Sequence, residues 1–100
     1  LNLITSKLST NSEKIIQLSS YPNPTNSNLT IEFLGKNTDI LSIQTFNTKG
    51  ENIHIPYYTN PINNYLTRII LNLEFVEVGT YFFSLTNVNN IKEVLTIIKN

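Results

Sequence analysis

The stretch NLTIEFL (residues 28–34) alternates apolar and polar side chains. Its apolar residues Leu29, Ile31 and Phe33 fall on one face of an extended chain, and the polar residues between them fall on the other. A period of two is typical of a β-strand that buries one face and exposes the other. This stretch therefore predicts a strand in a sheet with one apolar face.

Similar segments recur on both sides of this strand, with turn residues about every eight to twelve positions. The predicted strands cover residues 14–18, 28–34, 40–46, 51–55, 65–75, 80–86 and 91–98. Residues 47–50 are expected to join the third and fourth of them as a hairpin, and residues 87–90 to join the last two. Residues 56–64, with two prolines and three asparagines, are expected to be a loop or an irregular edge. About seven strands at this spacing favour two antiparallel sheets packed as a β-sandwich.

The alternation also predicts which side chains form the core. They are Leu29, Ile31, Phe33, Leu41, Ile43, Leu71, Leu73, Tyr81 and Phe83. Phe75 continues the face of Leu71 and Leu73, and we expect Tyr57 and Tyr58 to pack down on the sandwich. Gly79 is expected to hold a backbone conformation that a Cβ atom disfavours, because it turns the chain into the strand that follows.

The composition supports a single all-β domain. The chain has 100 residues, 40% of them hydrophobic, and contains no alanine, the best helix former. Its formal charge is zero with only 14% charged residues, so it lacks the basic surface that nucleic-acid binding requires. Cysteine is absent, and no apolar run approaches the ~20 residues of a membrane-spanning helix. Because Leu1 is not a start methionine, we expect a fragment in which residues 1–14 are a linker or the end of a preceding domain and residues 15–100 form the sandwich.

No group of side chains has the spacing of a catalytic or metal site. His54 is the only histidine and Asp39 the only aspartate, and no serine lies in a nucleophile elbow. Glu74 and Glu77 are expected to be solvated charges and not the carboxylate pair of a glycosidase. His54 is expected to be an exposed strand residue. The sequence therefore predicts no enzyme, no metal and no cofactor.

Four motifs follow one another along the chain. Tyr21-Pro22-Asn23-Pro24 leads into the strand at Leu29, the stretch IQTFNTKG ends at Gly50, GTYF begins at Gly79, and a strand with lysines at both ends closes the chain. In this order, the chain from about residue 15 to its end resembles the C-terminal sorting domain of the type IX secretion system of Bacteroidetes, in the form called type A. Two positions depart from the family pattern: Thr45 stands where an aliphatic residue is usual, and Phe46 where a tyrosine is usual.

The resemblance implies an immunoglobulin-like sandwich that serves as an address. Such domains fold in the periplasm, are recognised by the outer-membrane translocon, and are then typically removed by a sortase-like peptidase at the cell surface. The cargo would lie upstream of Leu1. In the family the signal lies mostly in the last two strands, which implies recognition residues at Gly79, Tyr81, Lys92 and Lys99. Residues 21–24 and Gly50 would be structural, with the Tyr21 ring packing its turn on the sandwich.

The last strand is expected to be an edge strand whose unpaired backbone groups a partner could extend. Lys92 and Lys99 would steer it toward acidic surfaces, or would only protect the edge against aggregation. The alternative function is an accessory module that binds carbohydrate or another surface ligand. Four tyrosines could supply the aromatic platform for a sugar: Tyr57, Tyr58, Tyr65 and Tyr81.

Overall fold

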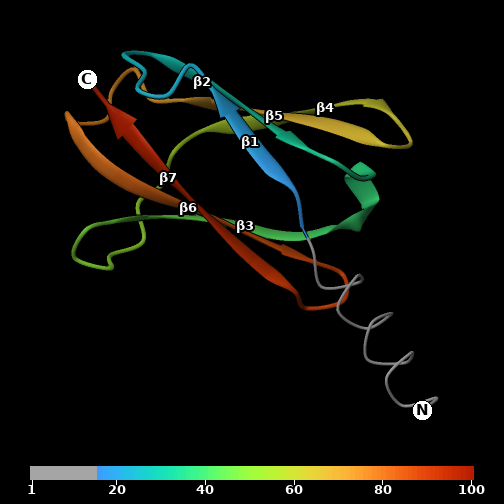
Figure 1. Cartoon of the computed structure of the whole chain (residues 1–100). Coiled ribbons are helices and arrows are strands. Elements are labelled where there is room, and N and C mark those ends of the chain that lie inside the picture. The colour runs from blue at the N-terminus through green and yellow to red at the C-terminus, as the bar shows by residue number, and fades with distance from the viewer. Residues whose placement is uncertain (1–15) are drawn as a thin grey trace, which may run out of the picture.

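The computed structural model describes residues 16–100 as two antiparallel sheets packed face to face (Figure 1). One sheet has the order β1-β2-β5-β4, and its strands are Leu18–Tyr21, Asn28–Phe33, Leu66–Asn72 and Tyr57–Asn63. The other has the order β3-β6-β7, with the strands Ile40–Asn47, Gly79–Asn87 and Lys92–Lys99. A 3-10 turn, η1, covers Asn37–Asp39. The predicted all-β sandwich of seven strands is confirmed, and the expected linker at residues 1–14 lies outside the described residues.

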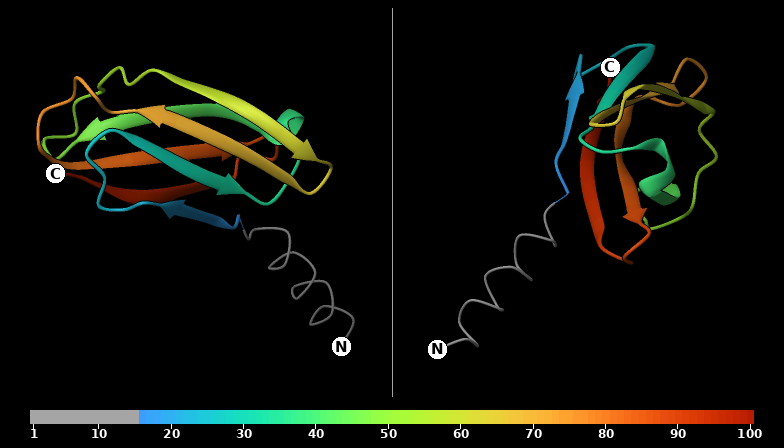
Figure 2. Two further views of the ribbon diagram at one scale, coloured as in Figure 1. Left: turned by 90° about the horizontal axis from the view of Figure 1, so that it is seen from above. Right: turned by 90° about the vertical axis from the view of Figure 1, so that its right-hand side faces the viewer.

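The strand order is that of a constant-type immunoglobulin domain, in which the first, second, fifth and fourth strands face the third, sixth and seventh. The left view of Figure 2 looks onto the face of one sheet with the other behind it, and the loops are gathered at the two ends of the sandwich. One end carries the C-terminus, the turn between β5 and β6 and the long loop between β3 and β4. The β4–β5 and β6–β7 turns lie at the other end.

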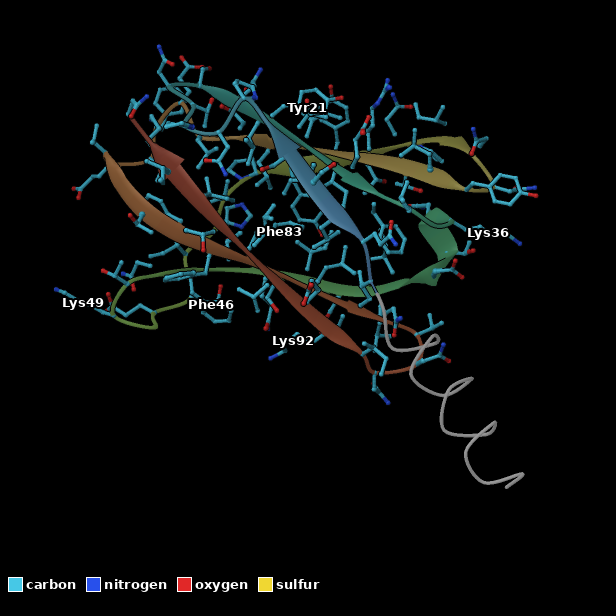
Figure 3. All side chains as sticks on the ribbon, viewed as in Figure 1. Tyr21, Lys36, Phe46, Lys49, Phe83 and Lys92 are labelled. Atoms are coloured by element: carbon cyan, nitrogen blue, oxygen red, sulfur yellow. The ribbon has the colours of Figure 1, made fainter. Side chains whose placement is uncertain are left out.

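The core lies between the sheets and is built mainly from the inward faces of β2, β5 and β6. Seven of the nine predicted core residues are buried: Leu29, Ile31, Phe33, Leu71, Leu73, Tyr81 and Phe83. Figure 3 shows Phe83 between the two sheets. Ile43 is half-buried at the margin of this cluster.

The prediction for Leu41 was wrong, since its side chain is 57% exposed. In the pairing of β3 with β6, Ile40 faces Asn87 and Ser42 faces Thr86, so Leu41 is an extra residue in β3. Such a bulge shifts the alternation by one position. Ile40, Ile43 and Thr45 consequently supply the inward side of β3, while Leu41 turns to solvent.

Three predicted segments differ from the structure. Residues 51–55 form no strand; only one isolated bridge joins Asn52 to Phe46, because the chain crosses here to the other sheet. Residues 56–64 contain β4, an edge strand whose register shifts after Pro61, so the irregular edge was the better of the two expectations. The first strand is Leu18–Tyr21, so it overlaps the strand predicted at residues 14–18 only at Leu18.

Two tyrosines and one phenylalanine are more exposed than predicted. Tyr57 is 46% and Tyr58 62% exposed, because β4 is paired on one side only and does not enter the core. Phe75 is 89% exposed. β5 ends at Asn72, so the alternation that buries Leu71 and Leu73 does not extend to Phe75.

Candidate recognition site at the C-terminal strand

The last two strands form a regular hairpin in which Gly79 pairs with Lys99 and Thr86 with Lys92. Its turn is closed by Asn87, whose side-chain oxygen accepts hydrogen bonds from the backbone N–H groups of Asn89 and Ile91 at 2.9 and 3.0 Å. β7 is the edge strand of its sheet, as predicted. Lys92 is exposed at its start and points away from the sandwich (Figure 3).

Lys99, at the other end of β7, is buried with 6% of its surface exposed. Its ammonium group donates to the backbone carbonyl oxygens of Leu73, Val76 (2.7 Å) and Glu74 (3.3 Å). An ammonium group has three N–H donors, and here all three have acceptors, which offsets the cost of burying the charge. The expectation of an exposed cation at residue 99 was therefore wrong: Lys99 braces the turn between β5 and β6.

Gly79 and Tyr81 shape the entry into β6. Gly79 has φ +154°, a region that side chains disfavour, so the prediction for its backbone is confirmed. Tyr81 is buried, and its hydroxyl donates to the Glu77 carbonyl at 2.7 Å. A tyrosine at the start of the sixth strand that bonds back to the chain a few residues upstream is the tyrosine corner of immunoglobulin-like domains. Burial raises the pKa of the Tyr81 hydroxyl above its ordinary value, and the nearby Glu77 carboxylate adds to the shift.

The turn at residues 21–24 lies against the last strand. The Asn23 side chain donates to the Thr96 carbonyl at 2.9 Å and accepts from the Ile98 N–H at 3.0 Å. Thr25 continues along the same edge in a parallel bridge: its N–H donates to the Ile98 carbonyl at 2.9 Å, and its carbonyl accepts from Asn100 at 2.8 Å. The first and last motifs of the sequence are thus one unit in space.

This contact shortens the part of the β7 edge that a partner strand could extend. From the Thr96 carbonyl to the Asn100 N–H, the outward backbone groups at the end of the chain are already bonded to Asn23 and Thr25. Alternate residues of an antiparallel strand face the same side, so the groups of Val94 face outward like those of Ile98. Among residues 16–100 none bonds to them, and only this first half of the β7 edge is open for a partner strand.

The Tyr21 ring lies along the outer face of the sandwich. It is 45% exposed, and its hydroxyl donates to a Glu32 carboxylate oxygen at 3.1 Å. The same carboxylate oxygen pairs with Arg68 at 3.1 Å. The Tyr21 side chain is therefore tied to the outer face of the sheet through its hydroxyl, and the packing of its ring on the sandwich stays a prediction.

The sequence matches the family described as the secretion system C-terminal sorting domain over residues 19–100. The chain belongs to this family. Its members are sorting signals for type IX secretion, without catalytic function, and mark proteins for export to the cell surface or the medium. No curated protein matches the chain.

The sorting domain keeps apart the residues that an enzyme would need together. His54 is exposed in the loop beside the start of β6, whereas Asp39 lies beside Val88, just past the end of β6. Nine residues of strand separate these two places, so the two side chains form no triad. Within residues 16–100 no three His, Cys, Asp or Glu side chains gather in a way that could hold a metal ion. No helix in this part of the chain is long and apolar enough to cross a membrane.

The four tyrosines of the alternative hypothesis are not brought together as a platform. Tyr81 is buried with its hydroxyl bonded. Tyr57 and Tyr58 are consecutive on β4 and point to opposite faces of their strand, while Tyr65 lies in the β4–β5 turn. Only Tyr57 and Tyr58 share a surface hollow, next to Ile40 and Leu41.

Two features of the sorting domain were not predicted from the sequence. The contact of Asn23 with β7 has no local signal, because the partners are more than 70 residues apart. The turn that carries Phe75 does have a local signal, which is Asn72. The Asn72 side chain accepts a hydrogen bond from the Glu74 N–H at 3.0 Å, and an asparagine that closes a turn in this way ends a strand.

Proposed function

We propose that this domain directs an upstream protein through the outer membrane by way of the type IX secretion system, and that a sortase-like peptidase then removes it at the cell surface. The family match over residues 19–100 carries the proposal. Its partners would be the outer-membrane translocon, the peptidase and a cargo in the same polypeptide, met after transit through the periplasm. Residues 15–100 would be the folded signal, and residues 1–14 the connection to the cargo.

The geometry favours a signal that is recognised as a folded surface. β7 is held on one edge by β6, on part of the other by Asn23 and Thr25, and at its end by Lys99. Of the proposed recognition residues, Lys92 is the one whose charge is available to a partner. Gly79, Tyr81 and Lys99 would act by fixing the shape of the chain around them, since Tyr81 and Lys99 are buried.

A secretion assay tests this function. The whole 100-residue chain is fused behind a periplasmic reporter in a Bacteroidetes host whose type IX system is intact. The reporter is expected at the cell surface or in the medium, and deletion of residues 93–100 is expected to trap it in the periplasm. Circular dichroism of the purified fusions separates trapping from misfolding. Unchanged secretion of the truncated fusion would refute the sorting function and leave the accessory binding module as the alternative.

A further inference from the structure

The turn between β5 and β6, residues 73–78, presents two apolar side chains to water. Phe75 is 89% and Val78 74% exposed. A single exposed apolar residue is ordinary on a protein surface. Phe75 and Val78 lie on one short turn and line the same groove, and exposed apolar groups gathered in this way mark protein contacts.

This turn is also held in shape by several hydrogen bonds. Lys99 donates to three of its carbonyl oxygens, Tyr81 to a fourth, and the Val76 N–H donates to Leu73 at 3.1 Å. The Asn72 side-chain oxygen accepts from the Glu74 N–H, and the Leu73 N–H donates to the Ser27 carbonyl. The backbone is therefore rigid while the Phe75 ring stays in solvent. A rigid apolar group loses little conformational freedom on binding, which is the property of a preorganised contact.

The charges around Phe75 indicate the character of its partner. Glu74 and Glu77 flank it and are exposed. The only ion pair between residues 16 and 100 joins Arg68 to Glu32, so neither of these two carboxylates is in an ion pair. A groove of about 450 Å³ separates this turn from the β3–β4 loop, whose Lys49 and His54 form the opposite wall. Figure 2 shows both segments at the end of the sandwich that carries the C-terminus.

We propose that residues 73–78 are a docking surface on which Phe75 enters an apolar pocket of the secretion machinery, with basic groups at the rim of that pocket facing Glu74 and Glu77. This inference rests on the proposed sorting function and names the surface that the machinery contacts. It also gives Lys99 a role, because this residue of the last strand holds the docking turn in shape. Deletion of β7 therefore removes the support of a surface that is not itself part of β7.

Tyr65 provides a matched control for Phe75. It is an exposed aromatic residue, 79% accessible, in the β4–β5 turn at the opposite end of the sandwich. Neither ring is part of the core, so replacing either one by serine is expected to leave the melting temperature of the domain unchanged. The two variants therefore compare two places on the surface at the same stability.

The test uses the full-chain reporter fusion and the fraction of reporter found outside the cell. We expect Phe75→Ser to lower this fraction roughly tenfold or more, the scale of an interface hot spot, and Tyr65→Ser to leave it unchanged. The double variant Glu74→Gln and Glu77→Gln is expected to lower the secreted fraction less than Phe75→Ser does. In a binding assay with isolated outer-membrane components, added salt is expected to reduce the difference in affinity between this variant and the natural domain.

The outcomes separate this inference from the proposed function. If deletion of residues 93–100 traps the reporter and Phe75→Ser is secreted normally, the docking surface is wrong and the sorting function stands. Equal losses for Phe75→Ser and Tyr65→Ser would also overturn the docking surface, because position would not matter. If the truncated fusion is secreted normally, the sorting function itself fails.

Discussion

Asn23 and Ile98 lie 75 positions apart in the sequence and are joined by a hydrogen bond of 3.0 Å from the Ile98 N–H to the Asn23 side-chain oxygen. The same amide donates to the Thr96 carbonyl at 2.9 Å, so it bonds the edge of β7 as a peptide group of a neighbouring strand would. The motif that opens the sorting-domain pattern therefore stabilises the strand that closes it.

We predict that Asn23→Ala lowers the free energy of unfolding by about 0.5–1.5 kcal/mol, because water replaces the two lost bonds to β7 and the one to the Ser20 hydroxyl at this exposed edge. Chemical denaturation measures this loss, and amide hydrogen exchange should show faster exchange at Ile98. Asn26→Ala is the control, since Asn26 is exposed in the same turn and none of the described hydrogen bonds uses its side chain. Equal exchange at Ile98 in the two variants would contradict the role given to Asn23.

The bulge at Leu41 leads to a second prediction. Leu29 is fully buried and Leu41 is 57% exposed, although both occupy apolar positions of alternating strands. Leu29→Ala should cost roughly 2–5 kcal/mol in denaturant unfolding, as for other buried leucines. Leu41→Ala should cost under about 0.5 kcal/mol. A large loss for Leu41→Ala would mean that β3 is regular and that residue 41 faces the core.

The contrast between these leucines shows what the sequence could predict. Alternation located β2 and β6 because each of them buries one face along most of its length, and β7 because it does so in its second half; this period is local. The bulge in β3 and the crossing after Gly50 depend on which strand lies alongside, and residues 40–55 carry no local sign of that. β4 was ambiguous because Pro61 weakens a strand pattern and an edge strand has no buried face to reveal it.

The candidate site also has features that the sequence predicts and features that it does not. The positions of the family motifs could be found in the sequence, and the turn-forming role of Gly79 followed from its place before a strand. The burial of Lys99 could not be predicted, because its three acceptors belong to a turn more than 20 residues upstream. A lysine at a strand end is usually exposed, and only the folded chain shows the carbonyl groups that hold this one.

Tyr81 makes stability depend on pH in the alkaline range. Its pKa is raised above the ordinary value of 10.0 in the folded protein, so the folded state holds this proton more tightly than the unfolded state does. The contribution is fully present below pH 10 and is lost as the pH rises through the higher folded pKa. Tyr81→Phe removes this contribution together with the bond to the Glu77 carbonyl.

We therefore expect Tyr81→Phe to be less stable than the natural protein by about 1–2 kcal/mol at pH 8. As the pH rises above 10.0, the free energy of unfolding of the natural protein should fall more steeply than that of the variant, so the difference between them narrows. The two proteins share every other side chain, so the comparison isolates Tyr81. A difference that stays constant across this range would mean that Tyr81 ionises as it does in the unfolded chain.

The two lysines of β7 give the sharpest test of the C-terminal end, because one is buried and the other exposed in the same strand. Lys99→Met keeps the length of the side chain and removes the ammonium group, which leaves the carbonyl oxygens of Leu73, Glu74 and Val76 without their donor. We expect a loss of roughly 2–4 kcal/mol in thermal or chemical unfolding, with faster proteolysis or hydrogen exchange in residues 73–78. Lys92→Met should change stability by under about 0.5 kcal/mol. If the two variants are equally stable, Lys99 lies in solvent like Lys92, and the brace that links the last strand to the Phe75 turn does not exist.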